Sequence, residues 1–210
     1  MKLDCDSLIF DMDGTLWNAV DSYCTIWNTT FDRLNIPHHP VTCDTLMKYM
    51  GMHLEDIVKN LCDDVQDKDT FLKLLDNNER TMMPILGGRL YPDVTTTISK
   101  IARGRRLFMV SNCGSHGLEN FLDYTGLRPY FTEALSHGGT GLDKTDNIKL
   151  LINRHQLKSP YYVGDTQGDA NAARKAGVGM IFASYGFGHV DKPDFTLKRF
   201  KDLEDIITLK

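Results

Sequence analysis

The chain has 210 residues, of which 41% are hydrophobic, so it is long enough for one ordinary domain with a small insertion and apolar enough for a packed core. Its formal net charge is −4 and its Lys and Arg residues are spread along the sequence, which argues against a nucleic-acid-binding protein. No signal-peptide-like segment and no apolar stretch of about 18 residues occurs, so we expect no membrane span and a cytoplasmic protein.

The first strand is predicted at the apolar run 8–10, which ends abruptly at Asp11, Asp13 and Gly14. A continuous apolar run is typical of a strand buried on both faces of a parallel sheet, and ligands bind at the carboxyl edge of such sheets. Two crowded carboxylates need compensation, and Mg²⁺ with a substrate phosphate is the natural partner. Taken alone, the Asp-x-Asp-Gly pattern is equally compatible with a solvated turn.

After Leu16 the sequence has a helical pattern for about seventy residues. A break is expected at Pro37–Pro40, and the helical stretch ends near 84–88. We therefore predict a separate helical domain, 17–86, inserted into a core domain made of 1–16 and 87–210. The helices expected in it cover 18–34, 43–49, 54–61 and 70–82.

From Tyr91 onward, helices and strands alternate, which predicts an α/β fold with a Rossmann-like, doubly wound parallel sheet. The Gly- and Ser-rich stretches 136–141 and 185–188 are expected to be loops. The five cysteines contain no C-x-x-C pair, which favours reduced thiols over a zinc site. The expected helices are 93–102, 117–125, 145–155, 168–176 and a closing 203–209, and the expected strands are 107–110, 133–135, 161–163, 178–183 and 194–197.

Several polar residues follow these strands, where the topology would bring them beside the two aspartates. Ser111-Asn112 offers a hydroxyl and backbone amides to an anion, and Lys144 offers a cation, although each alone is also an ordinary turn or surface residue. In the stretch 164–169, Asp165 or Thr166 could cap the following helix, which leaves Asp169 explained only by the helix dipole. In a metal site, one carboxylate would bind the cation and the other would orient its water.

The ordered set Asp11–Thr15, Ser111-Asn112, Lys144 and Gly164–Asp169 resembles the four signatures of the haloacid dehalogenase superfamily. The resemblance spans nearly the whole chain and is greatest with the phosphoglycolate phosphatase-like and β-phosphoglucomutase-like branch. The segment 17–86 resembles the helical cap of that branch. The stretch 91–94 is similar to its Tyr-Pro-Gly-Val return into the core, with an aspartate in place of the glycine.

The resemblance implies a Mg²⁺-dependent phosphatase that acts through an aspartyl-phosphate. In it, Asp11 is the nucleophile and Asp13 is the general acid and base, with a raised pKa. The implied roles of the other residues are Mg²⁺ binding by Asp11, the Asp13 carbonyl and Asp165, phosphate binding by Ser111, Asn112 and Lys144, and support of the site by Thr15 and Asp169.

The substrate is expected to be a small phosphorylated metabolite, and the protein a monomer or homodimer. The stretch 50–53 resembles the specificity loop of the cap. The candidates for contact with an anionic leaving group are therefore Gly51, His53 and the nearby Lys48 and Lys59. Methionines and a lone histidine, however, more often pack against neighbouring side chains. Two alternatives remain open. One is a sugar phosphomutase of the same superfamily, and the other is a regulatory binding module without turnover.

Overall fold

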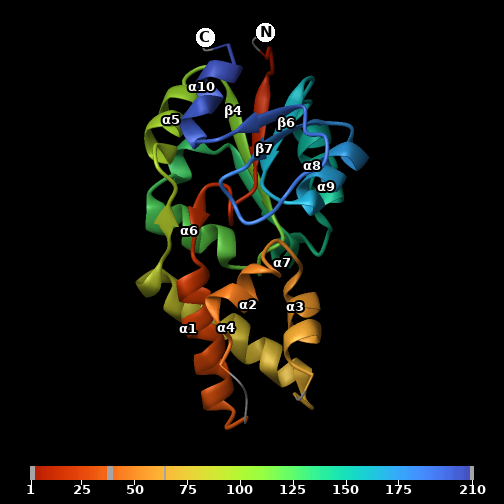
Figure 1. Ribbon diagram of the computed structural model, residues 1–210. Helices are drawn as coiled ribbons and strands as arrows, with labels where there is room; N and C mark the ends of the chain where they lie inside the picture. The colour runs from red at the N-terminus through yellow and green to blue at the C-terminus, as the bar shows by residue number, and fades with distance from the viewer. Residues whose placement is uncertain (1–2, 37–39, 64, 209–210) are drawn as a thin grey trace.

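The centre of the molecule is a six-stranded sheet with the order β5-β4-β1-β6-β7-β8, and every pair in it is parallel. A computed structural model describes residues 3–36, 40–63 and 65–208. The expected doubly wound parallel sheet is confirmed (Figure 1). In sheet order the strands are β5 (Glu133–Ser136), β4 (Arg106–Ser111), β1 (Ser7–Phe10), β6 (Pro160–Gly164), β7 (Gly179–Ala183) and β8 (Phe195–Leu197).

The sheet is covered on both faces, which explains why its central strand is a continuous apolar run. On β1, Leu8 and Phe10 pack into one hydrophobic cluster, and Ile9 packs into another on the opposite face. The first cluster includes residues of α5 (Val94–Ile101), α6 (Gly117–Thr125) and α10 (Leu203–Ile206). The second includes residues of α8 (Lys144–His155) and α9 (Gln167–Ala176).

A helical unit lies beyond the carboxyl end of the sheet (Figure 1). It consists of α1 (Val20–Arg33), α2 (Cys43–Met47), α3 (Leu54–Leu61) and α4 (Lys68–Leu86). Its interior is aromatic, with the rings of Phe31 and Phe71 4.7 Å apart and Trp27 beside Phe71. Two short antiparallel strands, β2 (Trp17–Asn18) and β3 (Arg89–Leu90), join the unit to the sheet domain.

Several element boundaries differ from the sequence expectations. Helix α1 begins at Val20 rather than at residue 18, because Asn18 pairs in β2 and its side-chain oxygen accepts the backbone N–H of Val20. Helix α4 runs through Pro84 to Leu86, so that expected helix was too short. The β2–β3 ribbon was missed because two residues per strand are too few to show a period.

Two further expectations at the surface of the sheet domain were wrong. The stretch 136–141 is not only a loop, since it contains the short helix α7 (His137–Thr140), whose first turn is capped by the Ser136 hydroxyl. The closing helix ends at Ile206, because Ile207 is buried and its backbone bridges to Leu3. The expected break at Pro37–His39 and the end of the closing helix at Leu209 lie outside the described residues. Among the described helices, none is long and apolar enough to cross a bilayer.

Candidate active site

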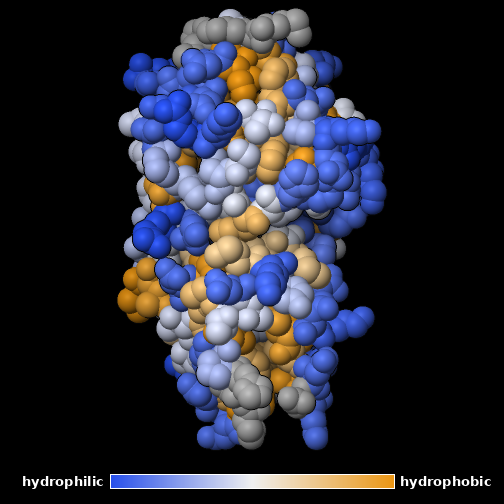
Figure 2. All heavy atoms as spheres, viewed as in Figure 1, coloured by the Kyte–Doolittle hydropathy of each residue, from blue (hydrophilic) through white to orange (hydrophobic). Residues whose placement is uncertain are grey.

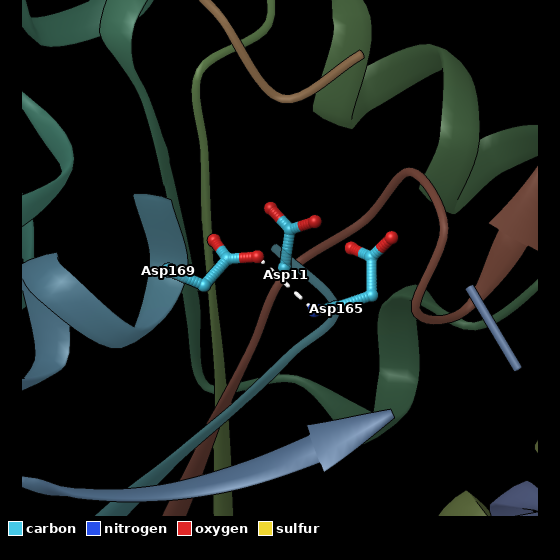
Figure 3. A group of neighbouring side chains, drawn as sticks. All are labelled: Asp11, Asp165 and Asp169. Carbon is cyan, nitrogen blue, oxygen red and sulfur yellow. Dashed lines mark hydrogen bonds between the residues drawn. The ribbon is translucent and has the colours of Figure 1, made fainter. Parts of the chain in front are cut away.

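Three aspartates converge at the carboxyl end of the sheet. Asp11 follows β1, while Asp165 and Asp169 lie after the neighbouring strand β6 and at the start of α9. One carboxylate oxygen from each lies within 4.8 Å of the others, and all three side chains are buried. Figure 3 shows Asp11 between the other two, with a hydrogen bond joining Asp169 to the backbone of Asp165. The predicted convergence of these residues is therefore present in the structure.

One buried cation serves this cluster. Lys144, the first residue of α8, places its Nζ 2.8 Å from Asp11 Oδ1 and 2.6 Å from Asp169 Oδ1. The two carboxylates hold the pKa of Lys144 well above its usual value although the amine is buried. Burial nevertheless raises the pKa of Asp11 to about 7, because one ammonium does not balance its loss of solvation and the charge of Asp169.

Asp169 has two functions. Its Oδ2 accepts hydrogen bonds from the backbone N–H and hydroxyl of Thr166 and from the backbone N–H of Asp165, which completes a capping box at the start of α9. Its Oδ1 accepts from Lys144. The expectation that a helix cap would leave Asp169 unexplained was therefore wrong. Both of its oxygens are occupied, so it positions its neighbours rather than offering a free ligand atom.

Of the three clustered aspartates, Asp165 is the one without an ion-pair partner among the described residues. Its Oδ2 accepts the backbone N–H of Phe187 at 2.7 Å, and its Oδ1 lies 3.4 Å from the Thr15 hydroxyl. Burial and the charges of Asp169 and Asp11 raise its pKa to about 8. Asp165 has no ion-pair partner in the described part of the chain, and Asp11 shares its one ammonium with Asp169, so the negative charge of this cluster exceeds its compensation. Oxygen ligands of this kind fit a hard divalent cation, so Asp11 and Asp165 form a suitable Mg²⁺ donor pair.

A glycine is required where the loop passes this cluster. Gly14 has a φ of +81°, and a Cβ there would lie 2.2 Å from Asp165 Oδ2. Any larger residue would displace the carboxylate as well as strain the backbone. The sharp stop after β1 is therefore necessary for the approach of the two aspartates.

The Asp13 carboxylate contacts side chains of β2 and of helix α1. Its Oδ1 accepts the indole N–H of Trp17 at 3.0 Å, and the hydroxyl of Tyr23 lies 3.5 Å from its Oδ2. Burial, followed by the charge of Asp11, raises the pKa of Asp13 to about 7. A carboxyl group that titrates near neutrality can both give and take a proton there, in agreement with the raised pKa expected from the sequence.

The end of β4 contributes Ser111 and Asn112. The Ser111 hydroxyl oxygen accepts the backbone N–H of Cys113, which leaves its proton available to another acceptor. The Asn112 amide donates to the carbonyl of Gly51 in the helical unit at 2.7 Å, while its own Oδ1 is buried without a partner. Asn112 therefore joins the two parts of the molecule at the edge of the site.

A cavity of about 60 Å³ lies between the two parts. Its sheet-domain side includes Asp11, Asp13, Ser111 and Asn112. The helical unit contributes Tyr23 and Glu79 as polar groups, and otherwise an apolar wall of Trp27, Leu46, Met50, Met52, Leu54 and Ile57.

The predicted specificity residues are only partly in this cavity. Gly51 lines it, whereas Lys48 and Lys59 are exposed and are not among its lining residues. His53 lies outside it with its ring 4.0 Å from that of His137.

The sequence reasoning missed Tyr23 and Glu79. Tyr23 gives no signal, because an aromatic residue on the inner face of a helix is ordinary. Glu79 gives one, because it follows Leu75 by four residues on the buried stripe of α4, where a carboxylate is unusual.

Comparison with known proteins agrees with this geometry. The sequence model of the haloacid dehalogenase-like hydrolase family matches residues 8–183. The phosphoglycolate phosphatase of Aquifex aeolicus is 26% identical over 204 residues, with 93% of each chain covered.

Solved structures of similar fold include a predicted phosphoglycolate phosphatase from Haemophilus somnus, with a TM-score of 0.84, 24% identity and coverage of 96% of this chain and 97% of that chain. They also include CbbY from Rhodobacter sphaeroides in complex with phosphate, with a TM-score of 0.82, 16% identity and coverage of 96% and 97%.

Proposed function

The chain belongs to the haloacid dehalogenase-like hydrolase family, and we propose that it hydrolyses a small phosphomonoester with Mg²⁺ through an aspartyl-phosphate on Asp11. Its family and its phosphoglycolate phosphatase relatives make it a phosphoric monoester hydrolase. One observation supports the proposed chemistry most strongly. The Asp11 carboxylate lies beside the buried ammonium of Lys144 and close to Asp165, a carboxylate without an ion-pair partner among the described residues. The cavity that Asp11 lines also contains Asp13, an acid with a pKa of about 7.

In the first half-reaction, an oxygen of Asp11 attacks phosphorus as the bond from phosphorus to the alcohol oxygen breaks. Lys144 holds the carboxylate in place through its 2.8 Å contact and contributes positive charge beside the phosphoryl oxygens. The Ser111 hydroxyl and the backbone amides of the following loop are the neutral donors on the other side. The products of this step are the free alcohol and a phosphorylated Asp11.

Asp13 handles the protons in both half-reactions. In its protonated form it donates to the departing alkoxide, and as a carboxylate it then takes a proton from the water that attacks the phosphorylated Asp11. The indole of Trp17 and the hydroxyl of Tyr23 fix the orientation of its two oxygens. A pKa of about 7 keeps both forms accessible near neutral pH.

The residues that would hold Mg²⁺ are Asp11, Asp165 and the backbone carbonyl of Asp13. When bound, the cation offsets the repulsion between the nucleophilic carboxylate and the phosphate dianion. Thr15 and Asp169 act indirectly, since Thr15 contacts Asp165 and Asp169 anchors both Lys144 and the Asp165 backbone.

The helical unit, 17–86, acts as a cap in this proposal. Its Gly51 carbonyl accepts a hydrogen bond from Asn112, and its side chains close the cavity over Asp11. Closure of this kind excludes bulk water during the attack on phosphorus. Figure 2 shows pale and orange side chains around the junction of the two parts, as expected for surfaces that pack when closed.

The test is Mg²⁺-dependent release of phosphate, first from p-nitrophenyl phosphate and then from a panel of phosphorylated metabolites. We expect turnover that is abolished by chelation and by Asp11→Asn. Near-wild-type turnover by Asp11→Asn would contradict the mechanism. Isomerised sugar phosphate without free phosphate would identify a phosphomutase, and binding without turnover of any ester would identify a silent binding module.

A further inference from the structure

The cavity contains a carboxylate that the proposed chemistry does not use. Glu79 of α4 lines it from the helical side, opposite Asp13 and the loop that follows β4. Its Oε2 lies 3.8 Å from the point that a Cβ on Gly114 would occupy, so the carboxylate reaches the segment next to Ser111 and Asn112. Glu79 therefore faces the space where the alcohol part of a phosphomonoester would lie.

No positive charge compensates this carboxylate within the described chain. The side chain of Glu79 forms no hydrogen bond or ion pair with a described residue, and the charged groups that act on it, Asp76 and Asp13, are both acidic. Burial and these two charges raise its pKa to about 8. Glu79 is only partly exposed, and a poorly solvated carboxylate without a partner is costly, so a ligand that supplies a donor removes that cost.

The rest of the helical wall, in the part of the chain that the structure describes, also lacks a positively charged side chain. Among the described residues that line the cavity there is no Lys, Arg or His. Lys48 and Lys59 are exposed, and burial together with the neighbouring His137 lowers the pKa of His53, which favours its neutral form. These placements oppose the expectation that Lys48, His53 and Lys59 meet an anionic leaving group.

We infer that Glu79 determines the leaving group, and that the substrate is a phosphomonoester whose alcohol part carries a hydroxyl or ammonium donor and no anionic group. This inference rests on the proposed phosphatase function and adds the substrate class to it. In this arrangement the donor of the alcohol part binds Glu79, and the apolar wall of the cavity covers its carbon chain. The Tyr23 hydroxyl is engaged with Asp13. A substrate such as 2-phosphoglycolate would instead place its carboxylate against Glu79.

The experiment measures binding at pH 9, above the pKa of about 8 of Glu79, so that this carboxylate is charged. The protein carries Asp11→Asn and Mg²⁺ is present, so that turnover does not interfere. Calorimetry compares four esters of equal chain length, namely 2-hydroxyethyl phosphate, phosphoethanolamine, ethyl phosphate and 2-phosphoglycolate. Repulsion between two carboxylates in a poorly solvated cavity predicts that 2-phosphoglycolate binds at least about tenfold more weakly than the better of the two donor esters. Ethyl phosphate, which lacks a donor, is expected to lie between them.

Two variants separate a direct contact from a general charge effect. Adding Glu79→Gln should reduce the preference against 2-phosphoglycolate by at least about fivefold, because the amide removes the charge and keeps the shape. Asp69→Asn removes the same charge in the first turn of α4, at an exposed residue that does not line the cavity, and should change the preference by less than about twofold. Thermal unfolding of each variant confirms that it is folded.

The outcomes distinguish this inference from the proposed function. Equal or tighter binding of 2-phosphoglycolate, an unchanged preference in Glu79→Gln, or no binding of any ester would overturn the role of Glu79. A donor preference in the Asp11→Asn background, together with no phosphate release by the wild-type protein from any ester, would refute the phosphatase and retain the role of Glu79. The comparison of hydroxyl with ammonium identifies which donor the pocket takes.

Discussion

Replacing Lys144 with methionine tests the charge arrangement of the site. The side chain is 6% exposed, and its Nζ contacts Asp11 and Asp169 at 2.8 and 2.6 Å. Methionine preserves most of the volume and removes the ammonium, so two buried carboxylates lose their partner. Removing one member of a buried ion pair typically costs about 3–5 kcal/mol in the free energy of unfolding.

The cost should depend on pH. In the wild-type protein the pKa of Asp11 is about 7, and Lys144 is one of the groups that lower it. Without the ammonium, the pKa of Asp11 rises further. The variant therefore loses most free energy of unfolding at a pH where Asp11 is ionised in the wild-type protein. We expect a loss of about 3–5 kcal/mol near pH 8 and a clearly smaller loss near pH 5.5, where Asp11 is protonated in both proteins.

Urea unfolding of the metal-free protein at the two pH values measures this difference. Lys149→Met is the matched control, because Lys149 lies on the same helix but is half exposed and 3.5 Å from Asp146. An exposed pair of this kind contributes about 0–1 kcal/mol. Equal losses in the two variants, or a loss at Lys144 that does not change with pH, would refute the reasoning. The same variant should also lose about 10²–10³-fold in phosphate release.

Three further predictions concern pH, proton transfer and backbone strain. In the absence of metal, the pKa values of Asp11, Asp13 and Asp165 are about 7, 7 and 8, against an ordinary value of 3.8. Because these pKa values are raised in the folded protein, the protonated groups contribute their full stability below pH 3.8, and this contribution is lost as the pH rises towards 8. Thermal unfolding with chelator should show this decline and saturating Mg²⁺ should reduce it, whereas stability that rises over this range would contradict the assignment. Asp13→Asn should lower kcat by about 10²–10⁴-fold for alkyl phosphates, and by less for p-nitrophenyl phosphate, whose leaving group needs no proton; equal losses would argue against an acid role. Asp93 has a φ of +66°, in the left-handed region that favours glycine, so Asp93→Gly should raise the free energy of unfolding by up to about 1 kcal/mol and Asp93→Ala should lower it, as measured in urea.

The sheet domain could be predicted from the sequence because each of its main strands is a short apolar run followed by a polar turn. The positions of Asp11, Ser111 and Asp165 follow from that pattern, since adjacent parallel strands end at the same edge. Lys144 needed more than the pattern, because a lysine at the start of a helix is usually exposed. Its assignment depended on the resemblance of the four ordered motifs to a known superfamily.

The side of the site formed by the helical unit could not be predicted in the same way. Its residues reach the cavity through the packing of helices, and an amphipathic pattern does not say which buried residue faces a ligand. Tyr23 and Trp27 are indistinguishable in sequence from ordinary core aromatics. Glu79 was detectable in principle as a charge on a buried stripe, but its environment depends on how α4 lies against the loop after β4.

The covalent role of Asp11 is the central claim, and trapping the intermediate tests it most directly. The enzyme is mixed with Mg²⁺ and an active substrate, quenched during turnover, and reduced with borohydride, which converts an aspartyl-phosphate to homoserine. Mass spectrometry of the peptide that contains Asp11 should show homoserine at that position only when substrate is present, and none in Asp11→Asn. Continued turnover with an unmodified Asp11, or modification at another residue, would contradict the mechanism.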